Sequence, residues 1–129
     1  MKERNVKIQW RAVLRDTLLF GAMTALGGLV VGLAAALNGE EPSMVVLAVS
    51  NILFGTVSFV ISACLVKIQR LRHLVIVGTF AWLIGLFNIF LGMASFAQWF
   101  FGVVAIAFMV LLGRAISSLF IPAAKAEVH

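Results

Sequence analysis

Residues 44–66 read MVVLAVSNILFGTVSFVISACLV and contain no charged side chain. A helix of this length, at about 1.5 Å per residue, spans the roughly 30 Å of hydrocarbon in a bilayer. Three further windows are similarly long and mainly apolar, at 17–37, 74–95 and 99–121. The sequence therefore predicts an all-α membrane protein with four transmembrane helices.

The overall composition agrees with a membrane protein. Of the 129 residues, 63% are hydrophobic and 12% are charged, whereas an ordinary soluble domain is roughly 45–50% apolar and about 25% charged. A soluble fold of this size cannot bury so much apolar surface, so we expect residues 1–129 to form a single transmembrane domain. Its predicted spans are joined by short connections at 38–43, 67–73 and 96–98. Short connections make neighbouring helices antiparallel, which predicts a compact antiparallel bundle.

The basic residues indicate how the chain is oriented. They cluster at 1–16, in the connection 67–73 and in the tail 122–129, whereas the connection 38–43 carries Glu40 and Glu41. By the positive-inside rule, both termini are then cytoplasmic, so that 1–16 is a cytoplasmic basic segment and 122–129 a cytoplasmic tail. This pattern is typical of a bacterial-type cytoplasmic (inner) membrane.

The first span has an alternative interpretation as a signal peptide, because a basic stretch precedes it and it ends in the small residues 34–36. Its apolar run of about 20 residues exceeds the 7–15 or so expected of a signal peptide, and three further spans follow. We therefore interpret it as a transmembrane helix.

The segment before the first span is amphipathic. Arg4, Lys7, Arg11 and Arg15 recur at helical spacing, and Trp10 lies on another side. This pattern predicts a short interfacial helix that binds anionic lipids at the cytoplasmic face, with a docking site for a cytoplasmic protein as the alternative. The net charge of +5 does not indicate nucleic-acid binding, because the basic residues lie beside apolar spans.

Small and weakly polar residues form stripes on three of the predicted helices. Membrane helices associate through such stripes, because lipid tails are as apolar as leucine. The residues expected at helix interfaces are Gly28, Gly32, Asn51, Gly55, Ser58, Gly85, Asn88 and Gly92. Spans two and three are predicted to pack tightly against each other, with Asn51 hydrogen-bonded to Asn88. These two amides are alternatively candidates for binding a cation or a permeating water.

Few ionisable residues lie within the predicted spans. Arg114 is expected either at the cytoplasmic interface or in an ion pair with Asp16, which lies at a similar depth,. His73 is interpreted as an interfacial side chain and Cys64 as a small buried one. Because the central parts of the spans lack Asp, Glu, Lys and His, the sequence argues against a proton-coupled carrier and against a zinc enzyme.

No catalytic, nucleotide-binding or metal-binding motif occurs in the sequence,. We therefore expect no enzymatic activity, no cofactor and no metal site. The favoured function is that of a membrane scaffold or accessory subunit, which packs against copies of itself or against a larger membrane protein. The alternative is a homo-oligomeric channel or facilitator for a small ion or solute, lined by Asn51, Asn88 and nearby Ser and Thr residues.

Overall fold

The computed structural model describes residues 7–66 and 68–121, and throughout this part the regular elements are helices. They are α1 (Trp10–Leu37), α2 (Met44–Leu65), α3 (Arg70–Ile84), α4 (Leu86–Phe90) and α5 (Phe96–Phe120). Taking α3 and α4 together, the described residues form four helices that are long and apolar enough to cross a membrane. The prediction of an all-helical chain with four candidate spans is confirmed.

Helix α1 begins earlier than the sequence predicts. It runs without interruption for 28 residues from Trp10 to Leu37, so Arg11 and Arg15 lie on its first two turns and not on a separate interfacial helix. Lys7 precedes the helix, and Arg4 lies outside the described residues. The predicted break between an interfacial helix and the first span is absent from the described part of the chain, because no glycine or proline interrupts the helix there.

Two glycines end the helices at the turns 38–43 and 91–95. Gly39 and Gly92 both have positive φ angles, of 68° and 71°. After each, the chain makes the pair of hydrogen bonds of a Schellman motif, for example Glu40 N–H to the Ala35 carbonyl at 2.9 Å and Gly39 N–H to the Ala36 carbonyl at 3.1 Å,. Gly92 is therefore a turn residue, and its predicted role in helix packing is wrong.

The third span is broken at Gly85, between α3 and α4. The Trp99 indole donates a hydrogen bond to the Trp82 carbonyl at 2.8 Å, and the Trp82 indole donates to the Trp99 carbonyl at 2.9 Å. The two rings stack with their centroids 4.3 Å apart. A helix commonly bends where a side chain hydrogen-bonds to a backbone carbonyl that would otherwise belong to the helical hydrogen-bond ladder. A Cβ at residue 85 would lie 2.9 Å from the same Trp82 carbonyl oxygen, which explains why this position is a glycine.

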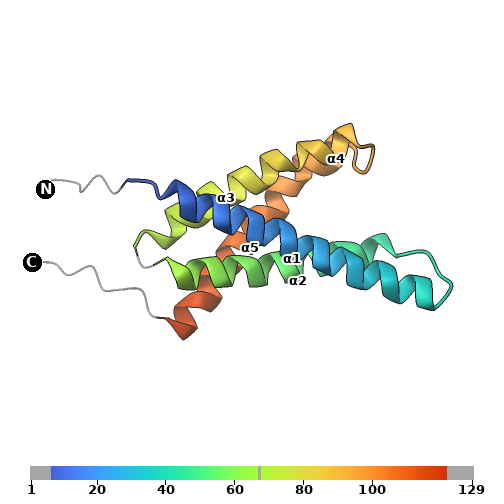
Figure 1. Cartoon of the computed structure of the whole chain (residues 1–129), viewed down its shortest axis with the longest axis horizontal. Coiled ribbons are helices and arrows are strands. Elements are labelled where there is room, and N and C mark those ends of the chain that lie inside the picture. The colour runs from blue at the N-terminus through green and yellow to red at the C-terminus, as the bar shows by residue number, and fades with distance from the viewer. Residues whose placement is uncertain (1–6, 67, 122–129) are drawn as a thin grey trace, which may run out of the picture.

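The four spans form two helical hairpins. Figure 1 shows that hairpin α1–α2 and hairpin α3–α5 cross near the end where α1 and α3 begin, here called the terminal end. They diverge toward their turns at the opposite end, here called the far end. The buried apolar cluster lies near the crossing and consists of Val13, Phe59, Ala63, Leu74, Val77, Met109 and Val110. The helices therefore do not pack as a compact bundle along their whole length.

Glycines set the closest helix contacts. A Cβ at Gly113 of α5 would lie 2.6 Å from the Phe59 Cβ of α2, and one at Gly55 would meet Met109 of α5. A Cβ at Gly27 of α1 would lie 2.7 Å from Phe54 of α2. Helix α2 therefore packs mainly against α1 and α5, and it touches α3 only slightly. The predicted tight packing of spans two and three is wrong, because Gly55, the glycine of α2, faces Met109 of α5 and Phe20 of α1.

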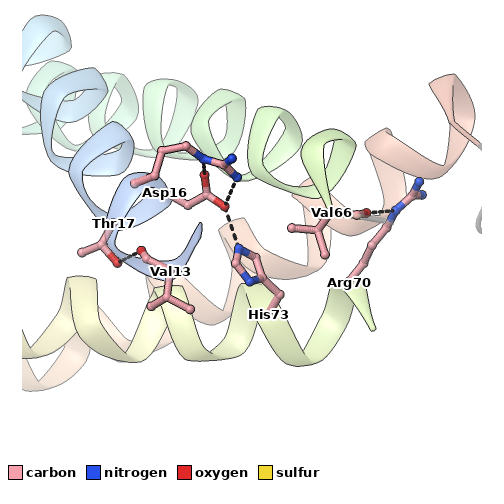
Figure 2. Close-up of polar contacts among 7 residues, drawn as sticks. Val13, Asp16, Thr17, Val66, Arg70 and His73 are labelled. Carbon is pink, nitrogen blue, oxygen red and sulfur yellow. Dashed lines mark hydrogen bonds and ion pairs between the residues drawn. The ribbon is translucent and has the colours of Figure 1, made fainter. Parts of the chain in front are cut away.

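Arg70 joins three elements at the terminal end. Its guanidinium donates to the Val66 carbonyl at 3.0 Å, just after α2, and to the Ile121 carbonyl at 2.6 Å, just after α5. The first of these bonds is drawn in Figure 2. The side chain thus satisfies carbonyls that the two helix ends leave without helical partners.

Candidate functional site

A buried acidic residue lies where the two hairpins cross. Asp16 of α1 is fully buried, and its Oδ2 lies 2.6 Å from the Nε2 of His73 on α3. Arg15 donates to the same carboxylate from Nε at 2.8 Å and from Nη2 at 3.1 Å. Figure 2 shows the carboxylate between the guanidinium and the imidazole. We refer to Asp16 and His73 as the buried couple.

Helix boundaries explain why these two side chains meet. Because α1 begins at Trp10 and α3 at Arg70, Asp16 lies in the second turn of α1 and His73 in the first turn of α3. Asp16 shares a broad helix face with Val13 and Phe20, both of which pack on or into the apolar cluster,. The same face that buries apolar side chains therefore buries the carboxylate.

This arrangement differs from two expectations. His73 is 8% exposed, so it is buried and not interfacial within the chain. Of the two alternatives predicted for Arg114, the ion pair with Asp16 is not found among residues 7–66 and 68–121, where the partners of Asp16 are Arg15 and His73. Arg114 lies on an exposed position of α5. Asp16 pairs with His73 because the crossing of the hairpins brings these two side chains together. A similar depth along the membrane normal was not sufficient to pair Asp16 with Arg114.

Three of the four residues of the predicted basic face lie within the described part of the chain. Lys7, Arg11 and Arg15 all have exposed side chains, while Arg15 also turns one side of its guanidinium toward Asp16. Trp10 makes an edge-to-face contact with Phe80 of α3, with centroids 6.0 Å apart. The start of α1 is thus held against α3 by an aromatic contact as well as by the buried couple.

A cavity of about 680 Å³ lies between the hairpins, and we call it the interhairpin cavity. Asn51 of α2 and Asn88 of α4 both line it, together with Gln98 and the stacked indoles of Trp82 and Trp99. The predicted hydrogen bond between Asn51 and Asn88 does not occur, because the divergence of the hairpins places both amides on the cavity wall. The predicted hydrogen bond is therefore wrong, and the alternative, that the two amides bind a cation or a permeating water, stays a prediction.

Some of the other predicted interface residues pack against a neighbouring helix, and others have free space beside them. Gly55 and Ser58 are buried in the contacts of α2, and Gly85 lies against Trp99. By contrast, a Cβ at Gly28 or Gly32 would have nothing within 4 Å. The α1–α2 contact uses the adjacent Gly27 instead, so the predicted small-residue stripe of α1 is left open on the surface.

A second, smaller pocket of about 330 Å³ lies at the terminal end, and we call it the terminal pocket. His73 lines it, with the basic side chains of Lys7 and Arg72. Arg72 is oriented by a hydrogen bond from Nη1 to the Gln69 Oε1 at 3.1 Å. The described lining contains no acidic residue, so this pocket is electropositive.

Helix α2 carries buried hydroxyl groups that make no hydrogen bond within the described residues. They belong to Ser50, Thr56, Ser58 and Ser62. Ser58 and Ser62 are fully buried, and they share one face of α2 with Asn51 at steps of three and four residues. Buried polar groups normally have a partner, either in the protein or in ordered water.

The residues in 7–66 and 68–121 form no group of three or more His, Cys, Asp or Glu side chains close enough to hold a metal ion. The candidate site is therefore the buried couple with the two cavities beside it. Sequence reasoning missed the couple because Asp16 and His73 are 57 residues apart. The available signal was the position of Asp16 on the apolar face of α1.

No protein-family model, no curated protein sequence and no solved structure matches this chain.

Proposed function

We propose that this protein is a non-enzymatic membrane scaffold or accessory subunit that packs against other transmembrane helices. The observation that carries the proposal is the open face of α1, formed by Gly28, Gly32 and Ala36. In contrast to Gly27, Gly55 and Gly113, the glycines of this face have no neighbour where a Cβ would stand.

An open glycine face suits a transmembrane helix as its partner. Small residues let two helix backbones approach closely, and van der Waals contact then replaces lipid contact. The partner is either a second copy of this chain or a helix of a larger complex. We place the protein in a bacterial-type inner membrane with both termini cytoplasmic, where the exposed Lys7 and Arg11 would contact anionic lipid headgroups,.

The test measures the native mass of the protein gently extracted from its membrane, with co-purifying proteins identified by mass spectrometry. Gly28→Leu with Gly32→Leu is expected to release the partner while the monomer stays folded. The matched control is Ala34→Leu, which adds bulk at an exposed position on the opposite side of α1. A monomeric wild-type protein, or a partner that both variants retain, contradicts the proposal.

A homo-oligomeric channel or facilitator for a small solute is the second candidate. The observation in its favour is that Asn51 and Asn88 line one cavity and do not bond to each other. In this case the native protein would be a homo-oligomer with no larger partner. Solute flux through reconstituted vesicles would then fall when both asparagines are replaced by leucine.

A further inference from the structure

We propose that Asp16 and His73 form a proton-binding site that passes protons between the terminal pocket and the interhairpin cavity. This activity goes beyond the packing function, and it does not depend on which helix occupies the open face of α1. Asp16 is fully buried within a candidate membrane-spanning helix. An ionisable side chain inside a membrane-spanning helix is costly, and such residues commonly belong to ion or proton paths.

The buried couple lies between the two spaces. His73 lines the terminal pocket, and Thr17, which follows Asp16 directly, lines the interhairpin cavity. The carboxylate and the imidazole are 2.6 Å apart, which is within the distance for direct proton transfer. His73 therefore borders the terminal pocket, and Asp16 lies behind it, next to the residue that borders the interhairpin cavity.

An aromatic contact closes the side toward the interhairpin cavity. Phe20 lies one helical turn beyond Asp16 on the same face of α1, and it lines the cavity,. Its ring centroid lies 5.3 Å from that of Phe59, which is fully buried. In this structure the couple is therefore accessible from the terminal pocket, and Phe20 and Phe59 separate it from the cavity.

Buried hydroxyls offer a polar route past this contact. Gly27 of α1 lies against Phe54 and Ser50 of α2. Residues of these two antiparallel helices therefore lie at the same depth when their numbers add to about 77–81. By this register Ser62 lies at the depth of Asp16, and Ser58 lies one turn nearer to Asn51. Both hydroxyls are fully buried and unbonded within the described chain. In this proposal they hydrogen-bond water that enters between Asp16 and Asn51 when the contact of Phe20 with Phe59 opens.

The proton transfer conserves atoms and charge without any redox step. A hydronium ion in the terminal pocket gives a proton to His73 Nδ1 and becomes water, and an N–H bond forms at Nδ1. The Nε2–H bond then breaks as Asp16 Oδ2 gains the proton. The carboxylic acid loses this proton to water on the side of Ser58 and Ser62. The imidazole returns to its starting tautomer by exchanging protons with water of the terminal pocket, with Nε2 gaining one proton and Nδ1 losing one. Every step is reversible, so the gradient sets the direction.

Other charged groups near the couple modulate this transfer. Arg15 contacts the carboxylate, and Lys7 and Arg72 line the terminal pocket beside His73. The elements α2 and α5 contribute the neutral hydroxyls of Ser62 and Ser117 to the buried region. The positive side chains disfavour accumulation of protons in the pocket, so the path fits a slow, regulated transfer better than an open pore.

The experiment uses the full chain reconstituted in vesicles that contain a pH-sensitive dye. A potassium diffusion potential drives protons inward, and the initial rate of acidification is measured. We expect the wild-type protein to exceed protein-free vesicles, and Asp16→Asn and His73→Gln to fall to the protein-free rate. Arg114→Gln is the matched control, because it removes an exposed charge of α5 that does not pair with Asp16, and it should retain the wild-type rate.

A gain-of-function variant keeps the test decisive if the first two variants fail to fold. Phe20→Ala removes the aromatic contact with Phe59 and should raise the rate above that of the wild type. A wild-type rate equal to that of protein-free vesicles overturns the proposal, as does an unchanged rate in Asp16→Asn or in Phe20→Ala. Because native mass and partner capture are measured separately, failure of this proposal leaves the packing function standing.

Discussion

Replacing Gly113 by alanine should destabilise the protein, although alanine is the better helix former. A Cβ at this position would lie 2.6 Å from the Phe59 Cβ, 3.1 Å from the Phe59 carbonyl carbon and 3.3 Å from the Val60 nitrogen. Two of these atoms belong to the α2 backbone, so no side-chain rotation relieves the clash. Helices α2 and α5 must separate or tilt.

The magnitude follows from two opposing effects. Adding a methyl group to a filled contact costs about 1–3 kcal/mol, whereas Gly→Ala in a helix interior gains about 1 kcal/mol. Gly102→Ala is the matched control, because it lies in the same helix and a Cβ there has nothing within 4 Å. Both variants share the gain in helix propensity, so the difference between them isolates the clash at about 1–3 kcal/mol.

Thermal unfolding of both variants in the same detergent measures this difference. At about 4 °C per kcal/mol for a chain of this size, Gly113→Ala should unfold about 4–12 °C below Gly102→Ala. Equal unfolding temperatures would refute the reasoning, because they would mean that α2 and α5 do not approach each other at this point.

Three further predictions concern the far end of the molecule. Trp99→Phe removes an indole hydrogen bond of 2.8 Å to a backbone carbonyl and should cost about 1 kcal/mol; Trp10→Phe, at a position 58% exposed, should cost much less, and thermal unfolding compares them. Ser95→Ala removes the capping box at the start of α5 and should cost about 1 kcal/mol; hydrogen exchange should accelerate in the first turn of α5 but not at its end. Asn51→Leu combined with Asn88→Leu should leave the unfolding temperature unchanged or higher, because both amides lie on a cavity wall; a clear loss of stability would instead indicate that the two amides bond to each other.

The number of candidate spans could be predicted from the sequence, because bilayer thickness fixes how long an apolar run must be,. The predicted second span, 44–66, differs from α2 by one residue. The larger errors come from features that hydropathy does not record. Helix α1 extends back to Trp10 because charged residues do not stop a helix, and the third span ends at Phe90 because Gly92 turns the chain.

The helix interfaces were less predictable, because several glycine faces compete for the same neighbours. On α1, Gly28 and Gly32 fit the pattern for packing better than Gly27, yet Gly27 makes the contact. The choice depends on the bulk of the facing residues, here Phe54, and periodicity within one helix contains no such information. For the same reason depth alone suggested Arg114 as a possible partner of Asp16, whereas the crossing of the hairpins brings Asp16 to His73.

Some glycines lie against a neighbouring helix and others have free space beside them. Their distribution along the helices explains why the hairpins cross at one end and diverge at the other. Gly55, Gly78 and Gly113 are filled by side chains of neighbouring helices, and all three lie around the buried apolar cluster. Toward the far end, Gly28 and Gly32 are open, and the bulky stacked indoles of Trp82 and Trp99 line the space between the hairpins. Close approach at the crossing buries Asp16 and His73, and divergence beyond it creates the cavity. The same packing pattern therefore produces both the buried ionisable pair and the space that borders it.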